Sequence, residues 1–202
     1  MGDSYLIEKQ LSSTELFKGD FLHAFCDTVR LPDGAVALRE YVVHSGAVMI
    51  IPLIEDDSGA IRVVLERQFR YPVGKVMIEF PAGKLDPGES IQQCAQRELL
   101  EETGYLAAEW ARAGVLHPVI SYSTEFIDIG FARGLKPGVQ KLDQGEFLEL
   151  FTATSKELLQ MCCDGVVTDG KTLAAALWLQ NVLSGAWTLN WEAPVLSSFT
   201  PS

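Results

Sequence analysis

The chain has 202 residues, 48% of them hydrophobic, which is enough for one sizeable core or for one core with a small appendage. Its formal net charge of −11 argues against nucleic acids and anionic membranes as partners, because both repel an acidic protein. The first ten residues contain acidic side chains and no apolar signal segment, so we expect a cytoplasmic location. The four cysteines form no C-x-x-C pair and the three histidines are scattered, which argues against a zinc site.

Residues 21–31 and 36–43 read as two strands, and the turn signal Pro32-Asp33-Gly34 between them predicts a hairpin. We expect residues 1–45 to form an antiparallel appendage to a main domain of residues 46–202. The appendage is too short to bury a core of its own, so it should pack on the main domain or on a partner chain.

The main domain is predicted to mix strands and helices without regular alternation, which favours a mixed sheet flanked by helices. Strands are expected at 46–53, 61–66, 74–80, 115–116, 126–132 and 147–151, and helices at 91–103, 155–163 and 172–183. Ser90 with Gln93 should form a capping box on the first helix, and Gly104 should end it. Trp187 and Trp191 are expected to pack an irregular C-terminal tail onto the body.

Three glutamates crowd the last turns of helix 91–103. At about 100° per residue, Glu98 and Glu102 fall within its apolar arc and Glu101 on the flank. Arg97 falls on the other side, where it should not satisfy the three acids. A buried carboxylate needs a partner, and oxygen ligands suit a hard divalent ion such as Mg²⁺ or Mn²⁺. Glu89, just before the helix, can turn back to the cluster or to Arg97, or favour the helix dipole instead.

Gly83, Glu89 and the run from Arg97 to Gly104 match the Nudix box, G-x5-E-x7-R-E-U-x-E-E-x-G-U, at every fixed position. Only Tyr105 departs, where the motif has an aliphatic residue. The chain therefore resembles the Nudix hydrolases, which cleave nucleoside diphosphates linked to another moiety with the help of metal ions. The resemblance implies an α/β/α sandwich with a mixed sheet.

Within that family the chain is most similar to the ADP-ribose pyrophosphatases, through REYVVHSGAVMIIPL, ERQFRYPVGKVMIEFPAG, GEFLEL and DGKTLAAALWLQ. The resemblance implies that the N-terminal strands form a dimerisation segment, and hence a homodimer. One departure concerns the loop HPVISYSTE, in which Ile120 stands where the subgroup commonly has proline.

The resemblance also implies roles for individual residues. Two or three Mg²⁺ or Mn²⁺ ions would be held by Glu98, Glu102 and Glu101 and by the backbone carbonyl of Ala82, with Glu89 in support and Arg97 orienting the acids. The general base would be Asp143, favoured by alignment, or Glu146, with Glu125 a further candidate. Expected substrate contacts are Arg70 for the diphosphate and, with weaker support, Arg39, Glu79 and Glu125.

Three functions remain open at this point. The first is hydrolysis of ADP-ribose to AMP and ribose 5-phosphate. The second is the same chemistry on GDP-mannose or another nucleotide sugar, which Ile120 keeps open. The third is a domain that only senses a nucleotide metabolite, against which the complete glutamate set argues.

Overall fold

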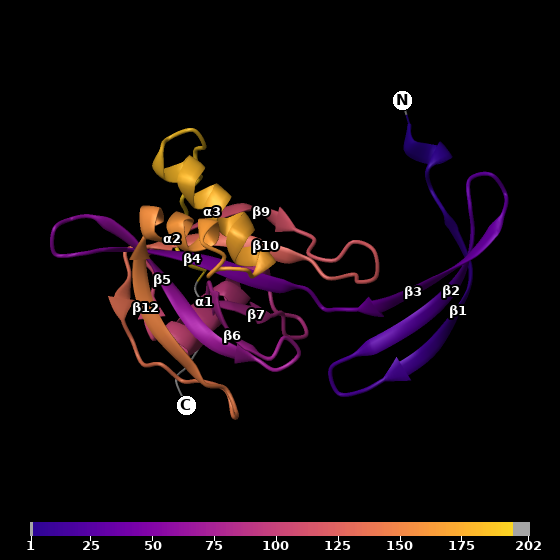
Figure 1. Ribbon diagram of the computed structural model, residues 1–202, viewed down its shortest axis with the longest axis horizontal. Helices are drawn as coiled ribbons and strands as arrows, with labels where there is room; N and C mark the ends of the chain where they lie inside the picture. Colours follow the sequence, from indigo (N-terminus) through magenta and orange to yellow (C-terminus); the bar gives the residue numbers. More distant parts are fainter. Residues whose placement is uncertain (1, 196–202) are drawn as a thin grey trace. The chain divides into compact units, whose positions relative to one another are not determined.

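The computed structural model describes residues 2–195, which fall into two compact units (Figure 1). The first unit holds the chain up to Gly46 together with His117–Phe126. The second holds Ala47–Leu116 and the chain from Ile127 onward. The loop that carries Ile120 thus belongs with the N-terminal strands, although it is distant from them in sequence.

The first unit is a three-stranded antiparallel sheet of β1 (Lys9–Lys18), β2 (His23–Arg30) and β3 (Val36–Val43), preceded by the 3-10 turn η1 (Asp3–Tyr5). The predicted hairpin is confirmed as β2 and β3. Strand β1 was not predicted, because all ten of its residues are exposed and leave no burial pattern to read. Residues of the loop 117–126 hydrogen-bond to the end of β3 at Val42.

The second unit is built on a mixed sheet in the order β12-β5-β4-β10-β9, with β6 paired to β5 and β7 to β4. Among the strands of this sheet that residues 2–195 form, β4 and β10 are the one parallel pair. Strands β8 and β11 form a separate two-stranded pair. The strands are β4 (Ala47–Glu55), β5 (Ile61–Arg70), β6 (Lys75–Glu79), β7 (Ala82–Lys84), β8 (Tyr105–Leu106), β9 (Glu109–Leu116), β10 (Ile127–Arg133), β11 (Lys136–Pro137) and β12 (Leu148–Thr154).

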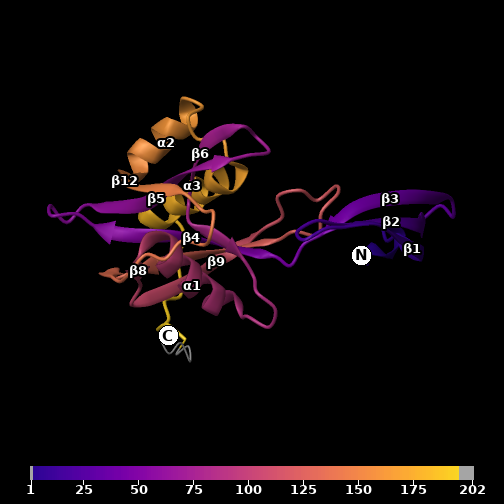
Figure 2. The same ribbon diagram turned by 90° about the horizontal axis from the view of Figure 1, so that it is seen from below.

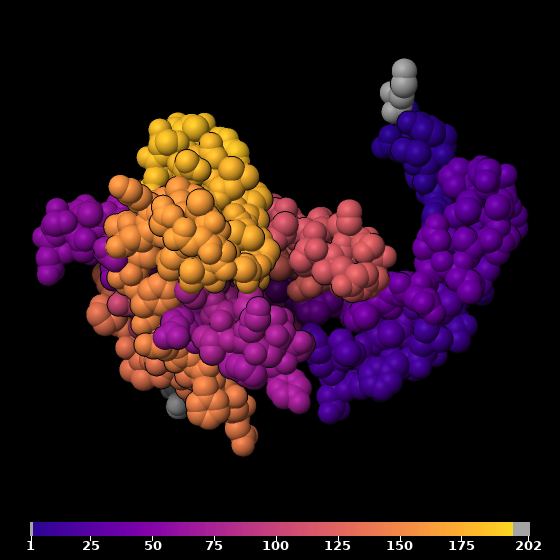
Figure 3. Space-filling view, viewed as in Figure 1, coloured from indigo at the N-terminus to yellow at the C-terminus, as the bar shows by residue number. Residues whose placement is uncertain are grey.

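Three helices cover the two faces of this sheet, which confirms the sandwich. Figure 2 shows α1 (Ile91–Thr103) on one side, and α2 (Ser155–Cys163) and α3 (Gly170–Leu183) on the other. In Figure 3 the orange and yellow atoms of α2 and α3 form the upper part of the near surface of this unit. No helix among residues 2–195 is long and apolar enough to cross a membrane.

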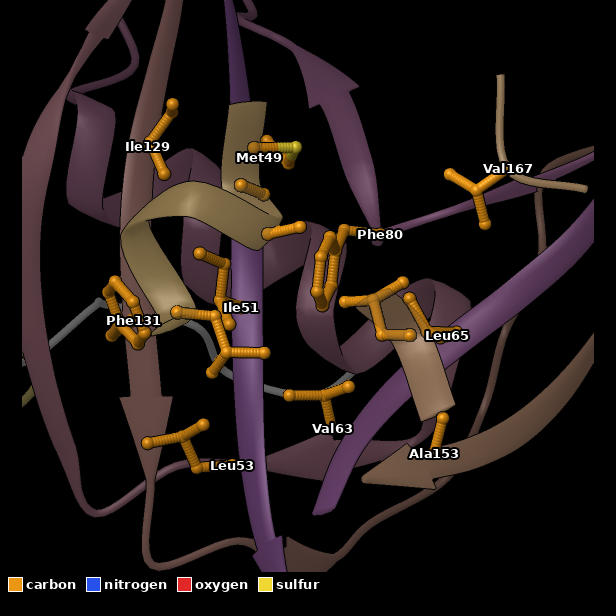
Figure 4. Packing of buried hydrophobic residues seen from close by; sticks show 14 of the residues in the cluster. Met49, Ile51, Leu53, Val63, Leu65, Phe80, Ile129, Phe131, Ala153 and Val167 are labelled. Atoms are coloured by element: carbon orange, nitrogen blue, oxygen red, sulfur yellow. The ribbon is translucent and has the colours of Figure 1, made fainter. Parts of the chain in front are cut away.

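Strand β4 lies in the middle and is buried on both faces. Because side chains alternate along a strand, Val48 and Ile50 pack with α1, whereas Met49, Ile51 and Leu53 join the larger cluster toward α2 and α3 (Figure 4). Burial on both sides explains why the sequence shows one continuous apolar run here.

The predicted helix 91–103 is confirmed at both ends. The Ser90 side chain accepts from the Gln93 backbone amide, and the Gln93 side-chain oxygen accepts from the Ser90 backbone amide, while Gly104 closes the helix at a φ of 70°. Other elements are longer than predicted: β5 runs on to Arg70, β9 begins at Glu109 and α3 begins at Gly170, with Asp169 as its N-cap.

The tail after α3 packs on the second unit as far as the structure describes it, up to residue 195. Trp191 packs against the larger core cluster, and Trp187 meets Trp178 edge to face. Glu192 pairs with Trp110 of the edge strand β9. The last part of the expected irregular tail, residues 196–202, lies outside the described residues.

Candidate active site

Four glutamates from three parts of the second unit share one electrostatic environment. Glu98 and Glu102 come from α1, Glu66 from β5, and Glu146 from the loop before β12. The pKa of Glu102 is raised well above 4.5, first by burial and then by the charges of the other three. Like charges that crowd each other in a buried place favour the protonated forms or a cation between them.

Glu66 is the most buried member of this group, with none of its surface exposed. Neither of its carboxyl oxygens has a hydrogen-bond partner among the described residues. It lies directly opposite Glu79 on β6, and burial followed by the Glu79 charge raises its pKa. A buried carboxylate with two unpartnered oxygens is costly unless a ligand completes it.

Glu102 and Glu98 lie on the core side of α1, as the helical wheel predicted. Glu102 is 3% exposed, and its Oε2 accepts a hydrogen bond of 2.9 Å from the Ala82 amide. Burial raises the pKa of Glu98 to about 7, against the opposing charge of Arg97. The backbone at Gly83 lies close to Glu98: a Cβ there would be 1.9 Å from the Glu98 carboxyl carbon, so any larger residue would displace this carboxylate.

Arg97 does not lie away from the acids, and that expectation was wrong. Its guanidinium donates to Glu98 Oε1 at 2.7 Å, to Glu101 Oε2 at 3.0 Å and to Glu89 at 2.9 Å. The long side chain curls over the helix surface, which a wheel of Cα directions does not capture. Glu89 therefore turns back to Arg97, and the hydrogen bonds from Arg97 lower the pKa of Glu89.

The loop between β11 and β12 is fastened to the C-terminal end of α1. The amides of Gly138 and Lys141 donate to the carbonyls of Gly104 and Glu101, and the Gln140 side chain donates to the Glu102 carbonyl. These bonds satisfy carbonyls that a helix end leaves without partners. They hold the start of the loop beside the residues that carry the glutamate cluster.

The loop offers two carboxylates, and only one reaches the cluster. The charge of Glu146 raises the pKa values of Glu66, Glu98 and Glu102. Asp143 is exposed, and its backbone amide donates to Glu146 Oε2 at 3.3 Å. The geometry therefore favours Glu146 over Asp143, the reverse of the preference taken from alignment.

Arg70 is held at the edge of the cluster by a buried ion-pair network. It donates twice to Glu79, at 2.7 and 2.9 Å, and its side chain remains 40% exposed. Glu79 is 2% exposed and also binds Lys171, which bonds in turn to Asp169. Both Glu79 oxygens are engaged, so Glu79 orients Arg70, and Arg70 presents the accessible cation.

Two expected substrate residues lie in the first unit. Arg39 pairs with Glu8, at 2.9 Å from its Nε, and Glu125 lies 4.0 Å from the His44 ring. Both residues belong to the first unit, whereas the four glutamates belong to the second.

Comparison with known proteins decides the family. Residues 43–178 match the profile of the NUDIX domain, and residues 8–42 match the nucleoside diphosphate sugar hydrolase N-terminal domain. The chain belongs to the Nudix family. It is a Nudix hydrolase, and two of the four clustered glutamates, Glu98 and Glu102, belong to its motif.

Individual relatives span nearly the whole of this Nudix hydrolase. An ADP-ribose pyrophosphatase from Bacillus subtilis is 32% identical over 87% of this chain and 94% of its own length. A methanol dehydrogenase activator from Bacillus methanolicus is 36% identical over 86% and 92%. A crystal structure of an ADP compounds hydrolase superposes with a TM-score of 0.79 at 22% identity, covering 89% of this chain and 95% of that one, which supports the fold.

The donor set of this Nudix hydrolase fits divalent cations. Carboxylates and the Ala82 carbonyl are hard oxygen donors, and the unpartnered oxygens of Glu66 face a site rich in negative charge. No three acidic, His or Cys side chains among residues 2–195 are already grouped around one point. Arg97 donates to one oxygen of Glu98 and one of Glu101, and so orients both carboxylates.

Three residues of this site were not predicted from the sequence. They are Glu66 of the cluster, Gln68, which donates to Glu146, and Lys171, which donates to Glu79. Glu66 had a signal, since it is a charged residue at the end of the apolar run VVL within a predicted strand. Gln68 and Lys171 carry no comparable local signal. Their contacts depend on strand pairing and on the approach of α3, which sequence spacing does not reveal.

Proposed function

We propose that this enzyme hydrolyses the diphosphate linkage of a nucleoside diphosphate sugar, with ADP-ribose as the substrate and AMP and ribose 5-phosphate as the products. The observation that carries the proposal is the cluster of buried Glu66 and Glu102 with partly buried Glu98 and Glu146, whose combined negative charge favours the binding of cations. The name of the Bacillus subtilis relative supports the choice of substrate.

In this proposal two or three Mg²⁺ or Mn²⁺ ions bind Glu98, Glu101, Glu102 and the Ala82 carbonyl, with Glu89 supporting through Arg97. Bound ions of this kind neutralise phosphate charge and lower the pKa of a water molecule. They also offset the acidity of the chain, so that an anionic substrate can approach. Arg97 fixes the orientation of Glu98 and Glu101 from the side.

Glu146 is the proposed general base that takes a proton from the attacking water, with Asp143 as the alternative. Arg70 binds a phosphate oxygen through the part of its guanidinium left accessible by Glu79. Arg39 and Glu125, both in the first unit, remain proposed substrate contacts. The nucleotide sugar is the proposed partner, without nucleic acid or membrane.

The same N-terminal strands are proposed to form a homodimer. Leu11 and Phe17 of β1 and Leu38 of β3 are 48%, 55% and 64% exposed, so this small sheet carries large apolar side chains that a second copy could cover. Light scattering after gel filtration should give twice the chain mass, and Phe17→Asp with Leu38→Asp should halve it. A monomeric wild-type chain would refute the dimer and leave the proposed chemistry standing.

A substrate panel with Mg²⁺ tests the reaction: ADP-ribose, GDP-mannose, ADP-glucose, NADH, diadenosine polyphosphates and nucleoside triphosphates. We expect ADP-ribose to lead by at least about ten-fold in kcat/KM, equivalent to about 1.4 kcal/mol of transition-state preference. Glu98→Gln and Glu102→Gln should lose the activity, whereas Glu149→Gln, an exposed partner of Arg67, should keep it.

Each other outcome has a defined meaning. If GDP-mannose or another nucleotide sugar leads, the substrate is wrong and the metal chemistry stands. If ADP-ribose binds and nothing is cleaved, the chain is a sensor and the proposed reaction is refuted.

A further inference from the structure

One face of strand β5 carries a row of polar side chains beside the glutamate cluster. Side chains alternate along a strand, so Glu66, Gln68 and Arg70 share a face, while Arg67 and Phe69 between them are exposed. Glu66 belongs to the cluster and Arg70 is held by Glu79. Gln68 lies between these two and has no role in the proposed function so far.

The Gln68 side chain reaches the loop carboxylate. Its Nε2 donates to Glu146 Oε1 at 3.1 Å, across 78 residues of sequence. The other Glu146 oxygen accepts a longer bond of 3.3 Å from the Asp143 amide. The amide of Gln68 is thus the side chain that ties the orientation of Glu146 to the sheet.

The loop has few other means of fixing Glu146. Lys141 is bound to the end of α1, and the chain rejoins the sheet at Leu148, which pairs with Gln68 itself. Six residues, 142–147, connect Lys141 to Leu148. Within them the Glu146 amide donates to the Asp143 carbonyl and closes a turn. A short span whose backbone is fastened at both ends leaves the side-chain torsions of Glu146 to be set by its hydrogen bonds.

A second feature of Gln68 concerns its own carbonyl. Oε1 is buried and has no hydrogen-bond partner among the described residues. A buried amide oxygen without a donor is unfavourable unless a ligand or water supplies one. The Gln68 side chain therefore donates through its NH₂ group to Glu146, while its carbonyl oxygen remains available to accept a hydrogen bond.

We propose that Gln68 is a positioning residue, which holds the Glu146 carboxylate in the orientation needed to accept a proton from the attacking water. This inference rests on the proposed function, in which Glu146 is the base. Gln68 acts through Glu146 and takes no proton itself.

A double-mutant cycle measures this coupling, with the best substrate of the panel and saturating Mg²⁺. Gln68→Met keeps the size of the side chain and removes both halves of the amide. We expect kcat to fall roughly 10- to 100-fold with KM within about two-fold, as for the loss of a residue that orients a catalytic group. In the Glu146→Gln background the same substitution should change kcat by less than about two-fold.

The controls separate positioning from folding. Arg67→Gln, on the opposite face of the same strand, should retain wild-type kcat, and melting curves should show that Gln68→Met folds. If Gln68→Met does not fold, Gln68→Glu serves instead, because it removes the same donor and places a like charge beside Glu146. We expect the same loss of kcat in the wild-type background and the same change of less than about two-fold in the Glu146→Gln background.

The outcomes distinguish the two proposals. If Glu146→Gln loses activity while Gln68→Met keeps it, or if the two losses multiply, the positioning role is refuted and the base stands. If Glu146→Gln retains full kcat, both the base and the role of Gln68 are refuted.

Discussion

Replacing Glu102 by glutamine should stabilise the metal-free enzyme. Burial and neighbouring charges raise the pKa of this carboxyl, so it takes up a proton on folding at pH 7.5. That pH lies three units above its ordinary pKa of 4.5. At about 1.4 kcal/mol per unit, protonating Glu102 on folding therefore costs at most about 4 kcal/mol of stability. Glutamine is neutral in both states and keeps an oxygen for the Ala82 amide.

Relaxation of the site and entry of water reduce this ceiling. We therefore expect a gain of about 1–3 kcal/mol in the free energy of unfolding, or about 2–4 °C in Tm per kcal/mol for a chain of this size. The assay is urea and thermal unfolding of both proteins in EDTA at pH 7.5, with Glu149→Gln as an exposed control that should shift by less than about 0.5 kcal/mol.

The pH dependence follows from the same carboxyl. Between pH 4.5 and its raised pKa, the folded state binds a proton that the unfolded state has lost, so stability falls as pH rises. Wild type in EDTA should lose stability from pH 5 to pH 8 more steeply than Glu102→Gln. Added Mg²⁺ should stabilise wild type and give the variant less. A loss of more than about 1 kcal/mol in Glu102→Gln in EDTA would refute the reasoning, because Glu102 would then be ionised and well paired without metal.

Three further substitutions have defined outcomes. Gly83→Ala places a methyl group against the Glu98 carboxyl, so kcat should fall at least about 100-fold with little change in fold by circular dichroism; unchanged activity would show that Glu98 need not stay there. Ser90→Ala removes the cap of α1 and should lower the free energy of unfolding by about 1 kcal/mol in urea, whereas no change would mean that the cap is dispensable. Lys171→Met leaves the buried Glu79 with one cation fewer and should lower stability by about 2–4 kcal/mol; a stabilised variant would contradict the network.

The sequence was most informative where structure depends on neighbours in the chain. The ends of α1 follow from Ser90 and Gly104, which act within one turn of the helix. The placement of Glu98 and Glu102 follows from the helical period. The burial of β4 on both faces follows from its uninterrupted apolar run.

The sequence was least informative where contacts join distant segments. Gln68 meets Glu146 only because β5 pairs with β12, and Arg97 bonds to three acids only because its long side chain can bend over the helix. The exposed strand β1 left no alternation of burial to read. These features need the fold before they can be seen.

Phosphorus NMR of ADP-ribose incubated with the enzyme and Mg²⁺ follows the proposed cleavage directly. We expect the diphosphate signals to give way to two monophosphate signals, those of AMP and ribose 5-phosphate, and we expect EDTA or Glu102→Gln to stop the change. Diphosphate signals that persist with Mg²⁺ and bound enzyme, or that decay equally in EDTA, would contradict a metal-dependent cleavage at the glutamate cluster.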